Sequence, residues 1–285
     1  MARILIDQAH NQAWALDADD AKRMNPTNPA DASYGKLASS LESSGHTIVS
    51  HQTGLIDSAA LSEVDLLIIP HASADEWEKT LGNGSPILAE TELAAIEKFV
   101  ASGGGLLILG ETEQPKYGNN FNQLSELFGI TIANATVQDP EKCFKDVATW
   151  IRPEFHRHVE SDFSYRVDGI CLYRTGVLEA SPTSDSEVIM RSSETASPAN
   201  APLGIAAKHH SGRVAVLADS DLFGDDSIED LDNRQFLLNI TGWLANARVV
   251  ANADLAKKSH WALTDKNWLK LQATIEALRP MQLGR

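Results

Sequence analysis

The distribution of apolar positions divides the first 110 residues into strands and helices. Short apolar runs predict strands at residues 3–7, 46–51, 65–70 and 106–109, and apolar residues at helical spacing predict helices at 33–44 and 90–102. The run at 65–70 has no polar alternation, which is typical of a strand buried on both faces. Strands that are linked through helices run parallel, and right-handed crossovers place helices on both faces of the sheet. The pattern therefore predicts an α/β protein with a doubly wound, mostly parallel sheet.

The pattern is less regular after residue 110. It predicts a helix at 120–128, strands at 129–132, 172–178 and 188–191, a hairpin of strands at 203–208 and 213–218, and a helix at 232–246. We expect Asp232 to cap the last of these helices, because aspartate is a favoured N-cap residue. The segment after the first strand is rich in Asp, Asn and Pro and is expected to be a loop, and the pattern from 136 to 168 is weak.

A further amphipathic segment, at 264–278, predicts an appended helix near the C-terminus. The chain has no internal repeat and no long linker. We therefore expect one domain over residues 1–248 and a helical extension over residues 249–285. Such a helix, with Trp261 and Trp268 in or beside it, usually docks on its own domain, and the alternative is a contact surface for a partner.

The net charge of the chain limits the classes of partner that it can bind. The 285 residues include 24 basic and 39 acidic ones, for a formal charge of −15, and no Lys/Arg cluster interrupts the excess of acid. Nucleic acids and anionic membranes would be repelled, so neither is expected as a partner. The two cysteines, Cys143 and Cys171, form no CxxC motif and predict neither a disulfide framework nor a zinc site. With no signal-peptide or membrane-span pattern, we expect a cytoplasmic protein.

Polar residues follow four of the predicted strands at the point where each ends. In open α/β sheets ligands bind outside these carboxyl ends, where the strand order reverses. The candidate binding residues at this rim are Asp7, His10, Asn11, His71, Glu111, Thr112, Asp219 and Asp221. The rim is therefore acidic and carries two histidines. Other histidines, such as His156 and His209, are expected to be surface residues.

A nucleophilic hydrolase or amidotransferase is the first function to consider for this rim. Its nucleophile would stand on a sharp strand-to-helix turn between glycines, in a G-x-C-x-G or G-x-S-x-G pattern. The corresponding stretch here is Gly110-Glu111-Thr112-Glu113-Gln114, with no Cys or Ser at its centre and no second glycine. The sequence therefore argues against an acyl-enzyme mechanism.

Two further functions remain open. Carboxylates and imidazoles such as Asp7, His10 and His71 bind divalent ions or act as acids and bases, although their spacing matches no named metal motif. Alternatively, the rim belongs to a non-catalytic binding or scaffold domain, and its polar residues serve a small ligand or a partner protein. Polar strand-end residues are also expected for structural reasons, because they cap helices and satisfy loop amides.

Several stretches resemble one known group of proteins. They are Gly103–Glu111, Asn119–Leu124, Glu126–Ile130, the start Ile4–Asn11 and the segment Gly212–Asp221 with its Asp-Ser-Asp ending. Together they resemble the GIFT domain, which is shared by a gliding-motility ABC-transport accessory protein and a subunit of the intraflagellar transport complex. The similarity extends over roughly residues 3–245 and is patchy between 136 and 200.

The resemblance implies a flavodoxin-like sheet of the class I glutamine-amidotransferase-like superfamily without its catalytic triad. It also implies association with transport machinery, carbohydrate-related roles or protein complexes. The favoured hypothesis is a non-catalytic ligand- or protein-binding domain of an assembly, with a protein or a small ligand such as a carbohydrate as partner, and with no cofactor and no metal. The alternative is a hydrolase or metal-dependent enzyme that uses the strand-end Asp, His and Glu residues.

Overall fold

The fold was analysed in a computed structural model, which describes residues 1–258 except 113 and 157–162. The chain divides into two compact units, residues 1–248 and residues 249–285. In the second unit the structure describes residues 249–258, which are helical, so the predicted helix at 264–278 lies outside the described residues. No helix in the described part of the chain is long and apolar enough to cross a membrane.

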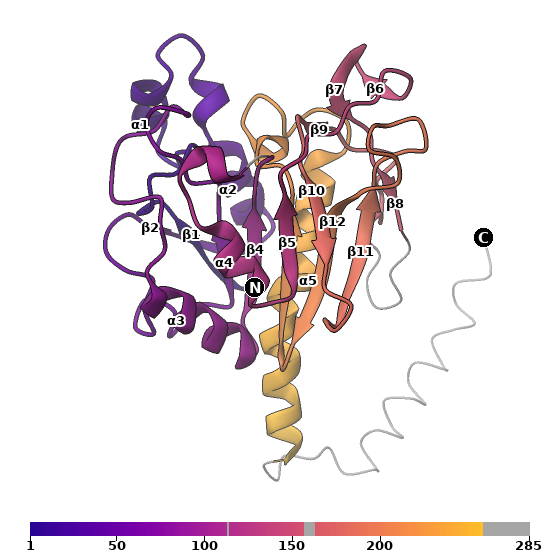
Figure 1. The fold of residues 1–285 in the computed structure, drawn as a ribbon. Coiled ribbons are helices and arrows are strands. Elements are labelled where there is room, and N and C mark those ends of the chain that lie inside the picture. Colours follow the sequence, from indigo (N-terminus) through magenta and orange to yellow (C-terminus); the bar gives the residue numbers. More distant parts are fainter. Residues whose placement is uncertain (113, 157–162, 259–285) are drawn as a thin grey trace, which may run out of the picture. The chain divides into compact units, whose positions relative to one another are not determined.

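A mixed sheet of eight strands forms the centre of the first unit (Figure 1). The strand order is β2-β1-β3-β4-β13-β12-β11-β8. The five strands from β2 to β13 are parallel, and β12, β11 and β8 continue the sheet in antiparallel pairs. The strands of this sheet are β1 (Arg3–Asp7), β2 (Thr47–His51), β3 (Leu66–Ile69), β4 (Gly105–Leu109), β8 (Glu154–Phe155), β11 (Ser186–Arg191), β12 (Pro202–His209) and β13 (Gly212–Leu217).

Helices lie on the two faces of this sheet and two small sheets flank it. The helices are α1 (Ala18–Met24), α2 (Gly35–Ser43), α3 (Glu90–Ala101), α4 (Phe121–Glu126) and α5 (Asn233–Lys258), with short 3-10 turns η1 (Pro29–Ala32), η2 (Gln114–Tyr117) and η3 (Asp221–Phe223). The small sheets pair β5 (Ile130–Ala133) with β10 (Val177–Ala180), and β7 (Val147–Ile151) with both β6 (Cys143–Phe144) and β9 (Leu172–Tyr173).

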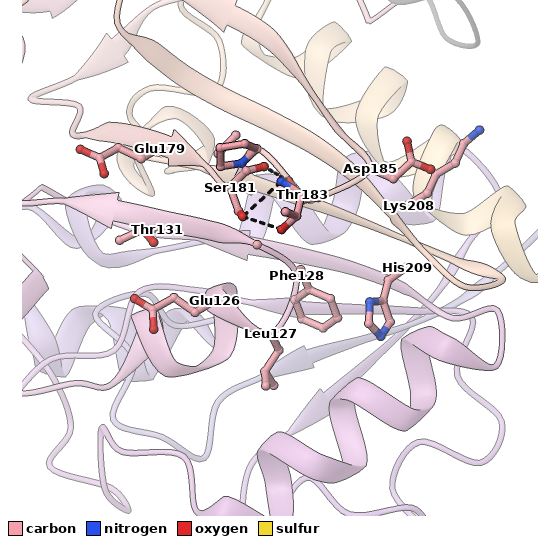
Figure 2. A pocket seen from close by; sticks show the side chains of 14 residues that line it. Glu126, Leu127, Phe128, Thr131, Glu179, Ser181, Thr183, Asp185, Lys208 and His209 are labelled. Atoms are coloured by element: carbon pink, nitrogen blue, oxygen red, sulfur yellow. Dashed lines mark hydrogen bonds between the residues drawn. The ribbon is translucent and has the colours of Figure 1, made fainter.

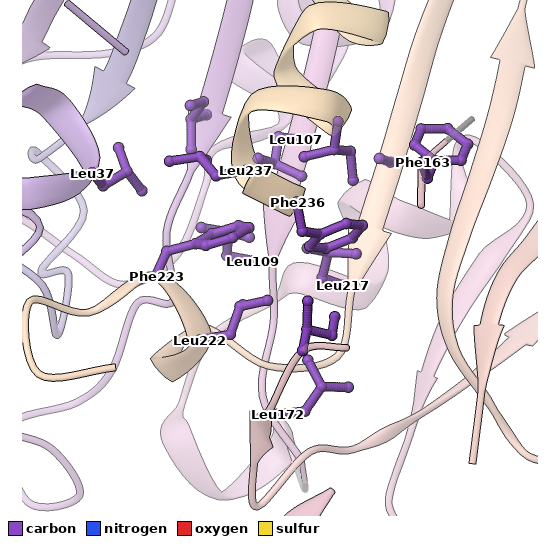
Figure 3. Packing of buried hydrophobic residues seen from close by; sticks show 14 of the residues in the cluster. Leu37, Leu107, Leu109, Phe163, Leu172, Leu217, Leu222, Phe223, Phe236 and Leu237 are labelled. Atoms are coloured by element: carbon purple, nitrogen blue, oxygen red, sulfur yellow. The ribbon is translucent and has the colours of Figure 1, made fainter. Parts of the chain in front are cut away.

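Alternate residues of each central strand enter two separate cores. On one face Leu107 and Leu109 of β4 pack with Leu37 of α2 and with Phe236 and Leu237 of α5 (Figure 3). On the other face Leu106 and Ile108 pack with residues of α3 and α4. Successive side chains of a strand point to opposite faces, so a run of apolar residues is what a strand covered on both sides requires. All four residues of β3 are buried, as predicted.

The segment after β1 contains a helix where the sequence pattern predicts only a loop. Asp17 caps α1, because its carboxylate accepts hydrogen bonds from the backbone N–H of Asp19 and Asp20. These are two of the N–H groups that a helix leaves without internal partners. The prediction of a loop was wrong because this helix is only seven residues long and has a short polar sequence with no extended apolar stripe.

Two other sequence-based boundaries need correction. The strand predicted at 172–178 is two strands, β9 and β10, because Arg174 between them has a left-handed backbone (φ 52°) and breaks the extended run. Asp232 lies at the predicted N-cap position, and its carbonyl oxygen accepts from the backbone N–H of Phe236, but its carboxylate accepts from the backbone N–H of Asp168 and Gly169. The side chain thus ties a loop to the start of α5, and α5 runs on to Lys258, past the predicted end at residue 246.

One side chain closes an edge of the smaller sheet. Asn122 of α4 donates from Nδ2 to the carbonyl oxygen of Ile132 (3.0 Å), and its Oδ1 accepts from the backbone N–H of the same residue (2.8 Å). Ile132 lies in β5, whose other neighbour is β10. The amide of Asn122 thus fills the hydrogen-bonding position of a further strand at this point.

Candidate functional site

The strands β3, β4 and β13 are neighbours in the central sheet, and their carboxyl ends lie side by side. Ile69 pairs with Ile108, and Leu109 pairs with Leu217, so the residues that follow these strands are neighbours. They surround a cavity of about 140 Å³. The lining residues are Ala13, Trp14, Asp31, His71, Glu78, Lys79, Glu111, Arg174, Ser220 and Asp221. Four predicted rim residues, His71, Glu111, Asp219 and Asp221, therefore lie in or directly beside this cavity.

Glu111 is held in place by Ser220, which follows β13 in the chain. Its Oε1 accepts from the backbone N–H of Ser220 (3.1 Å) and from Ser220 Oγ (2.6 Å), and Trp14 Nε1 donates to the same Oγ (2.9 Å). Burial, together with the nearby Asp219 carboxylate, raises the pKa of Glu111 to about 8. At neutral pH the Glu111 side chain therefore holds its proton in the folded protein.

Asp219 and Asp221 follow β13 and differ in their partners. Asp219 is fully buried, and its carboxylate accepts from the backbone N–H of Tyr173 and of Asp221, which holds the turn that leads into η3. The carboxylate of Asp221 is partly exposed to the cavity. Burial raises the pKa of both groups well above the usual aspartate value, helped at Asp221 by the charge of Glu111. Carboxylate oxygens of Glu111, Asp219 and Asp221 lie within 4.8 Å of one another, a spacing at which they could hold a metal ion.

His71 forms part of the cavity wall. It is 1% exposed, and neither ring nitrogen has a hydrogen-bond partner among the described residues. Its ring packs against the aromatic rings of Tyr117 (4.6 Å between centroids) and Phe121 (6.3 Å). Burial lowers the pKa of His71 to about 3, so the imidazole is neutral. A buried imidazole without partners is unusual, since buried polar groups are nearly always hydrogen-bonded.

Asp7 and His10 form a separate buried cluster with Glu92 of α3. His10 Nδ1 lies 2.8 Å from Asp7 Oδ2, and Nε2 lies 3.0 Å from Glu92 Oε1. Burial lowers the pKa of His10, but the hydrogen bond to Asp7 and the two carboxylate charges outweigh it, and the pKa is raised overall. An imidazolium that donates to both carboxylates uses both ring nitrogens, so His10 has neither a free lone pair nor a free N–H. The cluster ties β1 to α3.

Asn11 and Thr112 turn away from the cavity. Asn11 donates from Nδ2 to the carbonyl oxygen of Ser73 (2.6 Å) and to Asp75 Oδ1 (2.9 Å). Thr112 Oγ1 donates to the carbonyl oxygen of Ala135 (2.8 Å). Both residues hold loops that surround the rim.

The cavity also includes residues that the sequence pattern did not single out. Trp14 comes from the loop after β1 and stacks on Tyr34 (4.8 Å between centroids). Glu78 comes from the long segment after β3, and Arg174 from the turn between β9 and β10. The charges of Asp221 and Glu111 raise the pKa of Arg174 against the opposing effect of burial. The left-handed residue of this turn is Arg174 and not Gly176, so its conformation could not be read from the local sequence.

Neither cysteine lines the cavity. Cys171 is buried directly before β9, where burial raises the pKa of its thiol to about 12. Cys143 is partly exposed on β6. A thiol must be ionised to act as a nucleophile, and Cys171 is not ionised at neutral pH.

A larger hollow of about 650 Å³ is lined by residues that include Lys208 and His209 (Figure 2). These two residues end β12, which runs antiparallel to β13, so they lie near the amino ends of β4 and β13, away from the strand-end cavity. The side chains of Ser181 and Thr183 in its wall bond to each other (3.0 Å). None of the predicted rim residues lines this hollow.

The fold is similar to three solved structures of low sequence identity. The mmIFT52 N-terminal domain has a TM-score of 0.67 at 17% identity, over 85% of this chain and 97% of that domain. The cytoplasmic protein STM1381 from Salmonella typhimurium LT2 has a TM-score of 0.54 at 15% identity, over 86% and 99%. The cytoplasmic protein STM3548 from Salmonella typhimurium has 0.52 at 16%, over 87% and 98%. These similarities support a GIFT-like fold.

No family model and no curated protein sequence matches the chain. At these low identities the structural similarity describes the fold alone.

Proposed function

We propose that residues 1–248 form a GIFT-like binding domain that acts within a larger protein assembly and performs no acyl-enzyme chemistry. The order β2-β1-β3-β4-β13 of the parallel strands supports a flavodoxin-like core related to the class I glutamine amidotransferases. Residues 249–285 are then an appended extension. Two of the similar structures are named cytoplasmic proteins, and the cytoplasm is the setting that we propose.

The observation that carries this proposal is the side chain at the turn after β4. An acyl-enzyme mechanism needs an exposed thiol or hydroxyl there, with a base beside it and glycines around it. The turn instead holds Glu111, whose carboxylate is buried and bonded to Ser220. Ser220 itself is engaged by both Glu111 and Trp14, and no histidine contacts it among the hydrogen bonds of the described residues. The cavity therefore offers no activated nucleophile.

The binding partner of this domain is proposed to be a protein. The resemblance of the sequence to GIFT domains links the chain to transport machinery and protein complexes, and the fold similarity to the mmIFT52 domain agrees with that link. A carbohydrate ligand has no support in these fold similarities. The net charge of −15 favours a partner with a basic face.

Two measurements test the proposal. The tagged full chain should retain a protein in stoichiometric amount when it is isolated from a lysate of its own source, and the two should co-elute in gel filtration. An electrophilic glutamine analogue, 6-diazo-5-oxo-norleucine, should leave Cys143 and Cys171 unmodified in intact-mass spectra. Covalent labelling of either thiol with release of ammonia from glutamine would show an amidotransferase, and the proposal would be wrong.

The cluster of three carboxylates, from Glu111, Asp219 and Asp221, favours a second candidate function, that of a metal-dependent hydrolase. Hydrolysis of generic nitrophenyl esters and phosphates, measured with and without added Mn²⁺, separates the two functions. Turnover that requires Mn²⁺ and is lost in an Asp221→Asn variant would support the enzyme. Partner capture without turnover supports the binding domain.

A further inference from the structure

We propose that the strand-end cavity binds one divalent cation, with Glu111, Asp219 and Asp221 as its carboxylate ligands. These residues come from the ends of β4 and β13, which are paired neighbours in the sheet. This cation site is independent of the proposed partner binding, because it is argued from residues in and beside the cavity and not from any surface that a partner would contact.

The spacing of the three carboxylates suits an ion. One oxygen from each lies within 4.8 Å of the other two. An ion equidistant from three oxygens at the upper limit of this spacing would lie about 2.8 Å from each, slightly beyond the distances of about 2.0–2.6 Å in protein Mg²⁺ and Ca²⁺ sites. Side-chain shifts of a few tenths of an ångström would therefore bring the three carboxylates to coordination distance.

The carboxylates also have free acceptor capacity. In the described part of the chain, the Asp221 carboxylate and Glu111 Oε2 accept no hydrogen bond from the protein. The Asp219 carboxylate accepts from the backbone N–H groups of Tyr173, Asp221 and Leu222, so it has less spare capacity than the other two. The acceptor capacity that the described protein leaves open therefore lies mainly on Asp221 and on Glu111 Oε2.

The second, independent observation is His71. Its imidazole forms part of the wall of the same cavity, is 1% exposed, and finds no partner at either nitrogen within the part of the chain that the structure describes. An unsatisfied buried polar group costs on the order of 1–3 kcal/mol, so the fold retains His71 at a penalty. A water molecule bound to the cation would give this imidazole the partner that the protein does not supply.

The charge of the cavity points the same way. Arg174 lines the cavity and interacts with the charges of Asp221 and Glu111, whereas Lys79 pairs with Asp31 (2.9 Å) at the cavity wall. An ion that displaced the protons of the three carboxylates would meet three negative charges and the guanidinium of Arg174, and one divalent cation would balance the two negative charges that remain. Carboxylate and water oxygens favour hard ions such as Mg²⁺, Ca²⁺ and Mn²⁺.

Titration of the EDTA-treated full chain with Mn²⁺ tests the site, with free Mn²⁺ followed by its electron paramagnetic resonance signal. We expect one Mn²⁺ per chain, bound more tightly than about 1 mM, the weak end of protein calcium sites. Competition with Mg²⁺, Ca²⁺ and Zn²⁺ then ranks the ions.

Two variants and a matched control locate the ion. Asp221→Asn should weaken Mn²⁺ binding by at least about 100-fold, since loss of an outer-shell partner alone weakens metal sites about 10- to 100-fold. His71→Leu should weaken it by about 10-fold. Asp31→Asn, at the same cavity but outside the carboxylate group, should change it by less than about 3-fold. Circular dichroism confirms that each variant is folded.

Three results would overturn the site. They are the absence of a stoichiometric Mn²⁺ site in the wild-type chain, retention of that site in a folded Asp221→Asn protein, and an equal loss in Asp221→Asn and Asp31→Asn. None of these results bears on partner capture, so the two proposals fail separately.

Discussion

Replacement of Glu111 by glutamine should stabilise the metal-free protein at neutral pH. The pKa of Glu111 is raised from 4.5 to about 8 by burial and by Asp219. At pH 7 the unfolded chain releases this proton and the folded chain keeps it. The cost to the folded state is about 1.4 kcal/mol for each pH unit above 4.5, or about 3 kcal/mol at pH 7.

Glutamine removes this cost because its amide is neutral at every pH. Its side-chain oxygen can still accept from the N–H and Oγ of Ser220, the two bonds that hold Glu111 in place. Its NH₂ group takes the place of Glu111 Oε2 and needs a hydrogen-bond acceptor at that position. We therefore expect a net gain of about 1–3 kcal/mol in the free energy of unfolding at pH 7.

The pH dependence of the gain identifies its cause. Because the pKa of Glu111 is higher in the folded state, the stabilising contribution of its proton is complete below pH 4.5 and disappears as the pH rises through about 8. The Glu111→Gln protein and the wild type should therefore have equal stability near pH 4.5, and their difference should grow up to about pH 8.

Urea unfolding in EDTA at pH 5, 7 and 8.5, followed by tryptophan fluorescence, measures this difference. Glu179→Gln is the control, because Glu179 is an exposed glutamate on β10 and its replacement should change stability by less than about 0.5 kcal/mol. A Glu111→Gln protein that is less stable at pH 7, or a difference that is the same at pH 5 and pH 8.5, would refute the reasoning.

Three further substitutions test the frame of the site by urea or thermal unfolding. Gly84→Ala should destabilise by about 2 kcal/mol or more, because a Cβ there would lie 1.9 Å from the carbonyl oxygen of Ala9 on a left-handed backbone (φ +69°); unchanged stability would contradict the close contact. His10→Ala should cost about 3–5 kcal/mol, since it leaves two buried carboxylates without their shared cation; a cost below about 1 kcal/mol would mean that the cluster is not charged. Asn233→Ala should cost about 3 kcal/mol, because its buried Oδ1 accepts one backbone N–H and its NH₂ group shares its two hydrogens among three carbonyl oxygens. The partly exposed Asn239→Ala should cost less, and equal costs would contradict this reasoning.

The central strands could be predicted from the sequence because each has an apolar run at its centre. The strands predicted at 3–7, 46–51, 65–70 and 106–109 correspond to β1, β2, β3 and β4 within a residue or two, and the predicted hairpin corresponds to β12 and β13. Both faces of β3 and β4 are buried, so their sequences are apolar throughout, whereas the edge strand β2 is partly exposed and was marked only by Ile48 and Val49. The rule for strand ends then brought His71 and Glu111 to one cavity with Asp219 and Asp221.

The rest depended on contacts that leave no local pattern. The strand β6 is two residues long, and β6 and β7 are mostly half-exposed, so neither an alternation nor an apolar run marks them. Glu92 looks like a helix surface residue, yet it is 1% exposed because His10 reaches it from another element. Arg174 was expected within a strand, and only the turn between β9 and β10 brings it to the cavity. Such placements follow from tertiary packing, which a single sequence does not report.

The carboxamide of Asn122 bears on how this molecule meets its own copies. A strand border with free N–H and C=O groups is a template along which a second chain can add, and repeated addition produces fibrils. At Ile132 that template is already occupied from within the same molecule. Alanine at position 122 would leave one donor and one acceptor of the buried Ile132 without this partner. The carboxamide thus completes the hydrogen bonding of the ribbon at this point and leaves no open position there for a strand of a second copy.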